Sequence, residues 1–241
     1  RTLVEHAAVG APPTWVLANH DTARQVSRYA REQTDEPSFS LQSLLGRPAD
    51  LALGTRRARA AALLMLALPG SAYVYQGEEL GLPEVEDLPD EVLQDPEWTR
   101  SGHTRRGRDG CRVPLPWTPG GPPYGFSPAG AAPPWLPQPP GWDRLAVAAQ
   151  AGDPGSMLTL YRAALRLRRS HPALGDGTLR WLDAPDGVLA FARDPGFGCL
   201  VNVSDRPVPV PPGSRPLLAS CPLGAGDPLP PDATVWLQEP A

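Results

Sequence analysis

Residues 14–21 read Thr-Trp-Val-Leu-Ala-Asn-His-Asp, and this stretch predicts the fold of the first part of the chain. Five residues with apolar or β-favouring side chains run directly into Asn19, His20 and Asp21. This pattern is typical of a buried parallel strand that delivers polar groups at its C-terminal end. In closed α/β barrels, such strand ends carry the chemistry. The alternative is a strand that ends in an ordinary polar turn, since Asn and Asp are common turn formers.

A second strand of the same kind follows a helix. Residues 54–68, rich in Ala, Leu and Arg, predict a helix that ends at Pro69-Gly70. Residues 72–76, Ala-Tyr-Val-Tyr-Gln, predict another buried strand, and the polar residues Glu78 and Glu79 follow it. A strand, a helix and a strand with polar exits form a βαβ unit, which favours a parallel sheet.

The C-terminal part has a different pattern. Asp153-Pro154 predicts the start of a further helix, with Asp as N-cap and Pro in the first turn. Beyond it, short apolar runs are separated by Gly, Pro and Asp turns, which predicts an antiparallel β-sandwich. We therefore predict two domains, residues 1–172 and residues 173–241. The predicted strands of the second domain are Leu179–Leu182, Val188–Ala192, Cys199–Val203, Val208–Val210 and Thr234–Leu237.

Residues 81–152 form a long segment rich in Pro, Gly and Trp. A loop of this length without regular structure is normally functional or disordered. The proline pairs within residues 114–142 could be a polyproline ligand sequence. Large aromatic residues are interleaved there, namely Trp117, Tyr124, Phe126, Trp135 and Trp142. Aromatic residues at this density predict burial against a partner surface or at the rim of a pocket.

Composition excludes some classes of function. The net charge is −4, so we expect no nucleic-acid partner. All 22 basic residues are arginine, which indicates a bias of genomic composition rather than a function. The most apolar run, residues 60–68, is too short to cross a bilayer, so we expect no membrane association. The chain opens at Arg1 without an apolar leader, so we expect an N-terminus that is processed, trimmed or missing.

The cysteines predict a reducing compartment. Cys111, Cys199 and Cys221 are odd in number and widely spaced, which favours reduced thiols in the cytoplasm over a disulfide framework. Their spacing matches no metal-ligand pattern, and no glycine-rich phosphate loop is present. We therefore expect no metal and no cofactor.

Three motifs make the chain resemble the α-amylase family of glycoside hydrolases, and within it the intracellular α-glucosidases and oligo-1,6-glucosidases. They are Leu17–Asp21, Tyr75–Gly81 and Arg108–Trp117, in the family's order and with matching separations. The third motif departs from the family's pattern at Val113, Leu115 and Pro116, which leaves its arginines unchanged. By this resemblance the fold is α/β plus all-β: the last strands and helices of a TIM (β/α)₈ barrel, followed by a C-terminal antiparallel β-sandwich.

The resemblance also implies which side chains act. Asp21 matches the carboxylate that stabilises the transition state, and His20 matches an imidazole that binds the sugar; the alternative is a turn whose His–Asp pair is satisfied locally. Arg108 matches the arginine at the closed end of the pocket, where its planar donor fork suits a carboxylate and sugar hydroxyls. Arg112 either assists it or forms a structural ion pair. Glu91 matches an acid of the neighbouring subsite.

In this family the nucleophilic Asp and the acid/base Glu precede the Asn-His-Asp motif, so the chain is expected to be a C-terminal fragment that lacks both. The expected activity of the parent protein is that of a retaining α-glucosidase acting on a small oligosaccharide or disaccharide. Alternatives are a glucosyl-transferring relative that converts sucrose or trehalose, and a non-catalytic relative that serves as an interaction protein. A free-standing sugar-binding sandwich at residues 173–241 is a further alternative. Glu78 and Glu79 are expected to support the strand exit.

Overall fold

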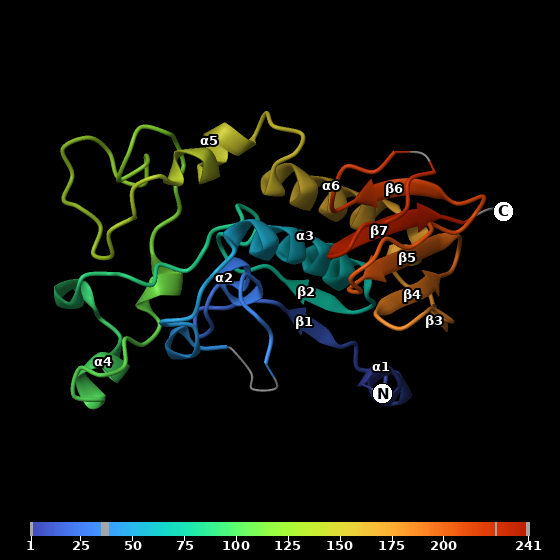
Figure 1. Ribbon diagram of the computed structural model, residues 1–241, viewed down its shortest axis with the longest axis horizontal. Coiled ribbons are helices and arrows are strands. Elements are labelled where there is room, and N and C mark those ends of the chain that lie inside the picture. The colour runs from blue at the N-terminus through green and yellow to red at the C-terminus, as the bar shows by residue number, and fades with distance from the viewer. Residues whose placement is uncertain (1, 35–38, 225, 240–241) are drawn as a thin grey trace. The chain divides into compact units, whose positions relative to one another are not determined.

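The computed structural model divides into two compact units, each built from separate segments of the chain (Figure 1). The described residues are 2–34, 39–224 and 226–239. The domain boundary predicted at residues 172 and 173 stays a prediction. The first unit comprises Arg1–Leu17, Arg56–Tyr73 and Leu160–Ala241, and the second comprises Ala18–Thr55 and Val74–Thr159.

The first unit begins with the predicted βαβ arrangement. After helix α1 (Thr2–Ala8), strand β1 (Thr14–Val16) pairs in parallel with β2 (Ser71–Tyr73), as Figure 1 shows. Helix α3 (Leu51–Ala67), most of which lies in this unit, connects them and ends just before Pro69-Gly70. The helix, both strands and their parallel pairing are therefore confirmed.

The expectation that these strands are buried is wrong for the described residues. Val16 and Tyr73 lie on one face of the pair and are 46% and 64% exposed. Trp15 and Ala72, on the other face, are half-buried, and the Trp15 indole nitrogen donates to the Pro69 carbonyl at 2.7 Å. Burial of both faces of a parallel sheet needs covering layers on each side. In the described part of the chain, this sheet has two strands and one face without such a layer.

The C-terminal strands form one antiparallel sheet with the order β3-β4-β5-β7-β6. Four of the strands match predicted runs, and Val208 forms only an isolated bridge with Leu229. Strand β6 was not predicted, because Pro216 disfavours a strand. Here β6 is the edge strand and its register shifts between Pro216 and Leu218, which accommodates the proline. The facing sheet of a sandwich stays a prediction. The strands are β3 (Leu179–Leu182), β4 (Val188–Arg193), β5 (Phe197–Asn202), β6 (Arg215–Ala219) and β7 (Ala233–Gln238).

Helix α3 packs against this sheet within the first unit. Trp236 of β7 is fully buried, and its indole nitrogen donates to the Leu63 carbonyl at 3.0 Å. The Thr234 hydroxyl donates to the Ala60 carbonyl at the same distance. Helix α6 (Met157–Ser170) adds Arg168, whose guanidinium donates to carbonyls at the end of α3. These carbonyls have no partner inside the helix, so the arginine satisfies them.

The second unit has short helices and long irregular loops around a small apolar core. Its helices are α2 (Gln25–Tyr29), α4 (Pro96–Arg100) and α5 (Val147–Gln150), with single 3₁₀ turns between them. Tyr124 and Trp142 of the predicted loop are buried in this core. The core comprises Leu80, Leu82, Val85, Leu88, Val113, Tyr124, Trp142 and Leu158.

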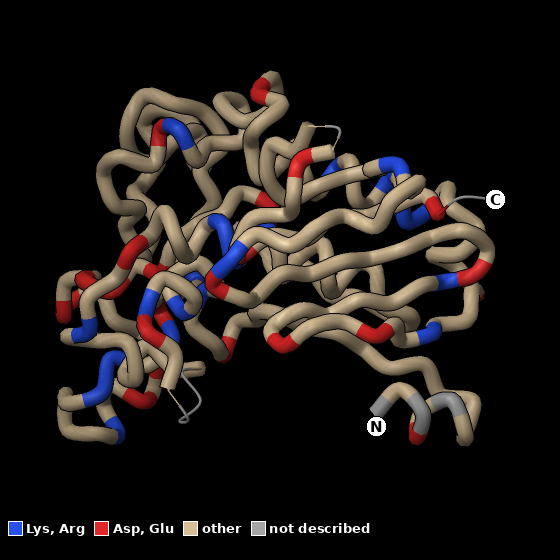
Figure 2. The backbone as a smooth tube through the Cα atoms, turned by 45° about the vertical axis from the view of Figure 1, so that its right-hand side comes forward, with Lys and Arg blue, Asp and Glu red and all other residues tan. Residues whose placement is uncertain are grey.

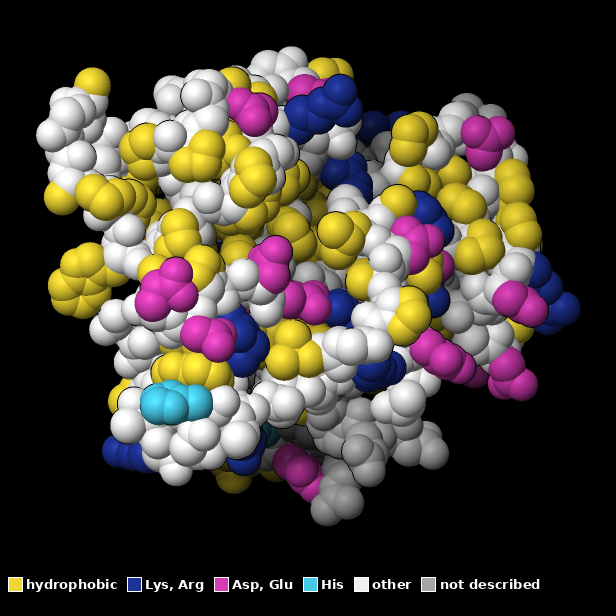
Figure 3. All heavy atoms as spheres, turned by 60° about the vertical axis from the view of Figure 1, so that its left-hand side comes forward, with side chains coloured by type: hydrophobic (Ala, Val, Ile, Leu, Met, Phe, Trp, Pro, Cys, Tyr) yellow, Lys and Arg dark blue, Asp and Glu magenta, His cyan; other side chains and the backbone are white. Residues whose placement is uncertain are grey.

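Not all aromatic residues of the loop are buried. Trp117, Phe126 and Trp135 remain exposed. On the face drawn in Figure 3, hydrophobic side chains lie scattered among polar and charged ones. Acidic and basic residues lie interspersed along the backbone in Figure 2. Among the described residues, no helix combines the length and apolar character that a membrane crossing requires.

Candidate functional site

The turn after β1 presents Asp21 to solvent. The Asn19 side-chain oxygen accepts the Asp21 backbone N–H at 2.8 Å, and the Asn19 N–H donates to the Thr22 hydroxyl at 3.1 Å. Asn forms such turns readily because its side chain satisfies the backbone two residues on. The polar turn that the sequence left as an alternative is therefore present, and it is also what orients Asp21.

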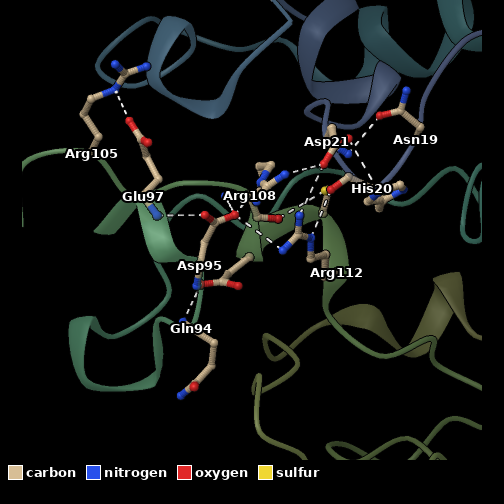
Figure 4. A network of polar contacts seen from close by, with 11 residues as sticks. Asn19, His20, Asp21, Gln94, Asp95, Glu97, Arg105, Arg108 and Arg112 are labelled. Carbon is tan, nitrogen blue, oxygen red and sulfur yellow. Dashed lines mark hydrogen bonds and ion pairs between the residues drawn. The ribbon is translucent and has the colours of Figure 1, made fainter. Parts of the chain in front are cut away.

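Arg108 lies between two carboxylates, as Figure 4 shows. One terminal nitrogen (Nη1) is 2.5 Å from Asp21 Oδ1, and Nε is 2.5 Å from Asp95 Oδ2. The Asp95 side chain is 1% exposed, whereas the Arg108 side chain is 42% exposed. The contact with the buried Asp95 therefore fixes the Arg108 guanidinium, and the contact with Asp21 leaves both side chains open to solvent. Hydrogen bonds to Asp95 and Asp21 raise the pKa of Arg108, so it stays charged.

Asp95 was not predicted as a site residue. It is the N-cap of α4, where its Oδ1 accepts the Glu97 N–H at 2.9 Å, and Pro96 follows in the first turn. Burial opposes ionisation of Asp95, but the hydrogen bonds from Arg108 and Glu97 outweigh it and hold the pKa of this carboxyl below its usual value. The Asp-Pro pair signals the helix start, but nothing local in the sequence signals the contact with Arg108.

Arg112 and His20 complete the network around Asp21. Arg112 donates from Nε to the His20 carbonyl at 3.0 Å, and its terminal nitrogens lie 3.5 Å from Asp21 Oδ1 and 3.4 Å from Asp95 Oδ2. The His20 Nε2 is 3.5 Å from Asp21 Oδ2. Arg112 thus belongs to the network. This is expected whether it assists Arg108 in binding sugar or forms a structural ion pair. Four of the five predicted site residues meet here (Figure 4).

A cavity of about 500 Å³ adjoins this network within the second unit. Asp21, Asp95 and Arg108 form part of its wall. Other charged and polar side chains in the wall are Thr22, Ser40, Gln42, Glu84, Glu97, Arg100 and Arg105. The volume falls in the range of small-molecule sites, and the mixture of carboxylates and guanidinium groups supplies acceptors and donors for hydroxyl groups.

The fifth predicted residue lies elsewhere. Glu91 is exposed on the 3₁₀ turn Asp90–Val92, and it is not among the described residues that line the cavity. Its assignment to a neighbouring subsite stays a prediction. The wall contains Glu97 and Arg105 instead, which form an ion pair at 3.1 Å. Both belong to residues 81–152, which the sequence described only as a loop, and Glu97 lies within helix α4.

Two carboxyl groups of the second unit, those of Glu78 and Glu84, are buried. Glu78 accepts the Tyr75 N–H at 2.6 Å, and Glu79 accepts the Gly77 N–H at 2.8 Å, which confirms that these residues support the strand exit. Glu84 accepts the backbone N–H of Arg24 at 2.8 Å. Burial raises the pKa of Glu78 and of Glu84 to about 7. In the described part of the chain, no group of three or more His, Cys, Asp and Glu side chains is arranged to hold a metal ion.

Comparison with known proteins gives consistent matches. Residues 4–177 match the family model for the α-amylase catalytic domain. A probable α-glucosidase from Rhizobium meliloti is 38% identical over 195 residues, covering 80% of this chain and 31% of its own. An oligo-1,6-glucosidase from Parageobacillus thermoglucosidasius is 28% identical over 179 residues, covering 67% of this chain and 28% of its own.

Among solved structures, an α-glucosyl transfer enzyme is similar over 99% of this chain and 43% of its own, with 30% identity and a TM-score of 0.73. The chain thus spans about a third of the length of the curated relatives it matches, 31% and 28% for the two named above.

Proposed function

The chain belongs to the α-amylase family of glycoside hydrolases, and from this premise we propose that it supplies the sugar-binding part of an α-glucosidase site. The proposed substrate is the terminal glucose of a short α-linked oligosaccharide or disaccharide. Within the site, Asp21 stabilises the transition state, His20 and Arg112 hold sugar hydroxyls, and Arg108 closes the pocket. These roles follow the family's motifs residue by residue.

One observation carries the proposal: Arg108 is held between Asp21 and the buried Asp95 beside a cavity of about 500 Å³. A guanidinium fixed by a buried carboxylate presents its remaining N–H groups in a defined direction. A carboxylate next to it accepts hydroxyl hydrogen bonds and stabilises positive charge that develops on a sugar ring. A pocket closed by such a pair accepts a chain end, so we expect cleavage from the non-reducing end.

A retaining glycosidase also needs two carboxyl groups about 5–5.5 Å apart, one as nucleophile and one as acid/base. We assign both to parts of the protein outside these 241 residues. The support for this assignment is the order of the motifs in the family and the coverage of about a third of the relatives' length. On this proposal the 241-residue chain alone does not hydrolyse p-nitrophenyl α-glucoside.

The test uses the full-length protein and maltose, isomaltose and p-nitrophenyl α-glucoside. Replacing Asp21 by Asn keeps the shape of the side chain and removes its charge. We expect kcat to fall by about 100-fold or more while KM changes little, because the charge acts mainly in the transition state. Asp90→Asn, an exposed acid paired with Arg106, is the matched control. A kcat within about threefold of wild type after Asp21→Asn would refute this role.

A second candidate is glucosyl transfer to another sugar. The solved structure at 30% identity is that of an α-glucosyl transfer enzyme, and its similarity covers nearly the whole chain. Product analysis of reactions with maltose or sucrose separates the candidates: hydrolysis releases free glucose in proportion to substrate consumed, whereas transfer yields new disaccharides or longer sugars. A full-length protein without turnover on any of these sugars would favour the non-catalytic relative.

A further inference from the structure

Arg24 contacts two of the three motif segments, Tyr75–Gly81 and Arg108–Trp117, although no role follows for it from the motifs themselves. The residue lies three positions after Asp21 and is 2% exposed. One terminal nitrogen, Nη1, donates to the Gln76 carbonyl at 2.7 Å, and the other, Nη2, donates to the Cys111 carbonyl at 2.8 Å. Its backbone N–H donates to the buried Glu84 carboxyl at 2.8 Å. One side chain therefore links the turn after β1, the exit of β2 and the turn that carries the site arginines.

The contact with Cys111 fixes the backbone between Arg108 and Arg112. Arg112 ends the 3₁₀ turn Asp109–Arg112 and Arg108 is its N-cap, and the Cys111 thiol contacts the Arg108 carbonyl at 3.2 Å. Holding the Cys111 carbonyl therefore limits movement of both arginines relative to Asp21. A planar guanidinium can donate to two carbonyls of different loops at once, which a single ammonium group cannot do with the same geometry.

Gly77 and Tyr75 accommodate the Arg24 guanidinium. Gly77 has a positive φ of 88°, and a Cβ at this position would lie 2.4 Å from Arg24 Nη1. The glycine therefore leaves space for the guanidinium as well as meeting the backbone requirement. The ring of Tyr75 lies on another side, with its centroid 5.5 Å from the guanidinium carbon. An aromatic face at this distance stabilises a buried cation.

We propose that Arg24 is a positioning residue that sets the distance between Asp21 and the arginines of the 108–112 turn. It is not among the described residues that line the cavity, so it acts through Arg108 and Arg112. That this positioning serves α-glucoside turnover rests on the proposed function. The positioning itself is a property of the fold of the second unit and can be measured without an activity assay.

The chain contains two buried thiols that make this measurement possible. Cys111 is 1% exposed next to the Arg24 contact, whereas Cys199 is 2% exposed in the sheet of the first unit. Burial raises the pKa of both thiols, so each should react with N-ethylmaleimide only when its surroundings open. The rate at Cys111 therefore reports local opening of the turn, and the rate at Cys199 reports opening elsewhere or global unfolding.

The experiment compares Arg24→Met, Arg24→Lys and the exposed control Arg144→Met by residue-resolved mass spectrometry of N-ethylmaleimide labelling. Arg24→Met removes both donated hydrogen bonds and should raise the Cys111 rate about tenfold or more, with Cys199 unchanged. Arg24→Lys keeps the charge and one donor, so an intermediate rate is expected. An unchanged Cys111 rate would overturn the proposal, as would an equal rise at both thiols, because that marks a general loss of stability.

The second readout is kinetic and uses the full-length protein at a temperature well below unfolding. Displaced arginines should lower kcat/KM for p-nitrophenyl α-glucoside about tenfold or more in Arg24→Met, with partial recovery in Arg24→Lys. Selective labelling of Cys111 without any kinetic loss would overturn the link to catalysis. A wild-type protein without α-glucosidase activity would refute the proposed function, and the labelling alone would then decide whether Arg24 positions the turn.

Discussion

Replacing Asp95 by Asn tests the arrangement that fixes Arg108. Asp95 accepts from Arg108 Nε at 2.5 Å, from the Arg108 backbone at 3.2 Å and from the Glu97 N–H at 2.9 Å. A hydrogen bond to a charged group contributes about 1.5–3 kcal/mol. The Arg108 side chain is 42% exposed, so solvent screens the pair and the lower part of this range, about 1.5–2 kcal/mol, applies. Asn keeps the N-cap, whereas Asp95→Ala should cost about 1 kcal/mol more.

The assay is urea unfolding at pH 7, with Asp90→Asn as the matched control. Asp90 pairs with Arg106 but is 64% exposed, so its loss should cost only about 0–1 kcal/mol. The pKa of Asp95 is lowered in the folded state, so its contribution is present above the carboxyl pKa of the unfolded chain. It is lost as the pH falls through the lowered value. The difference in unfolding free energy between wild type and Asp95→Asn should therefore become smaller in acid. A loss of unfolding free energy no larger than that caused by Asp90→Asn, or one independent of pH, would refute the reasoning.

Three further outcomes are expected. Burial raises the pKa of Glu78 and Glu84 from 4.5 to about 7, so the folded chain binds protons that the unfolded chain has released. Each bound proton stabilises the fold by up to about 3 kcal/mol; this contribution is complete below pH 4.5 and is lost as the pH rises through 7. Replacing either Glu by Gln should therefore make the free energy of urea unfolding less dependent on pH between about pH 5 and 8. A Cβ on Gly110 would lie 2.3 Å from a backbone carbonyl, so Gly110→Ala should cost about 1–3 kcal/mol in thermal unfolding, whereas Gly152→Ala, with open space around it, should change stability by less than about 0.5 kcal/mol. Arg108→Lys should cost about 2–4 kcal/mol in kcat/KM for maltose in the full-length protein, and unchanged kinetics would remove Arg108 from the pocket.

Local patterns predicted the first unit's elements well. The Ala/Leu-rich run that forms α3 and the strands on either side of it have strong propensities and clear end signals at Pro69-Gly70. Burial of those strands was not predictable, because it depends on which layers cover the sheet. Strand β6 escaped prediction because Pro216 lies within it. The proline is tolerated because β6 is the edge strand of the sheet and its register shifts after Pro216.

Only part of the site was predictable from the sequence, because some of its contacts depend on the tertiary fold. The motifs named His20, Asp21, Arg108 and Arg112, and the structure brings all four together. Asp95 was missed because its pairing with Arg108 depends on how an irregular loop folds back over thirteen residues. Arg24 was missed likewise, since its acceptors lie 52 and 87 residues further along the chain. Long-range polar contacts of this kind leave no periodic pattern in a sequence.

The irregular loop beside the site has a thermodynamic consequence of its own. Eleven prolines lie between residues 114 and 142, so the unfolded segment samples far fewer backbone conformations than an ordinary chain of that length. Ordering it around Tyr124 and Trp142 therefore loses less entropy, by about 0.4–1 kcal/mol for each proline whose folded conformation suits the ring. The prolines thus stabilise the shape of this loop through the unfolded state, in addition to the burial of Tyr124 and Trp142. Replacing its prolines by glycine should weaken the fold without removing a single hydrogen bond.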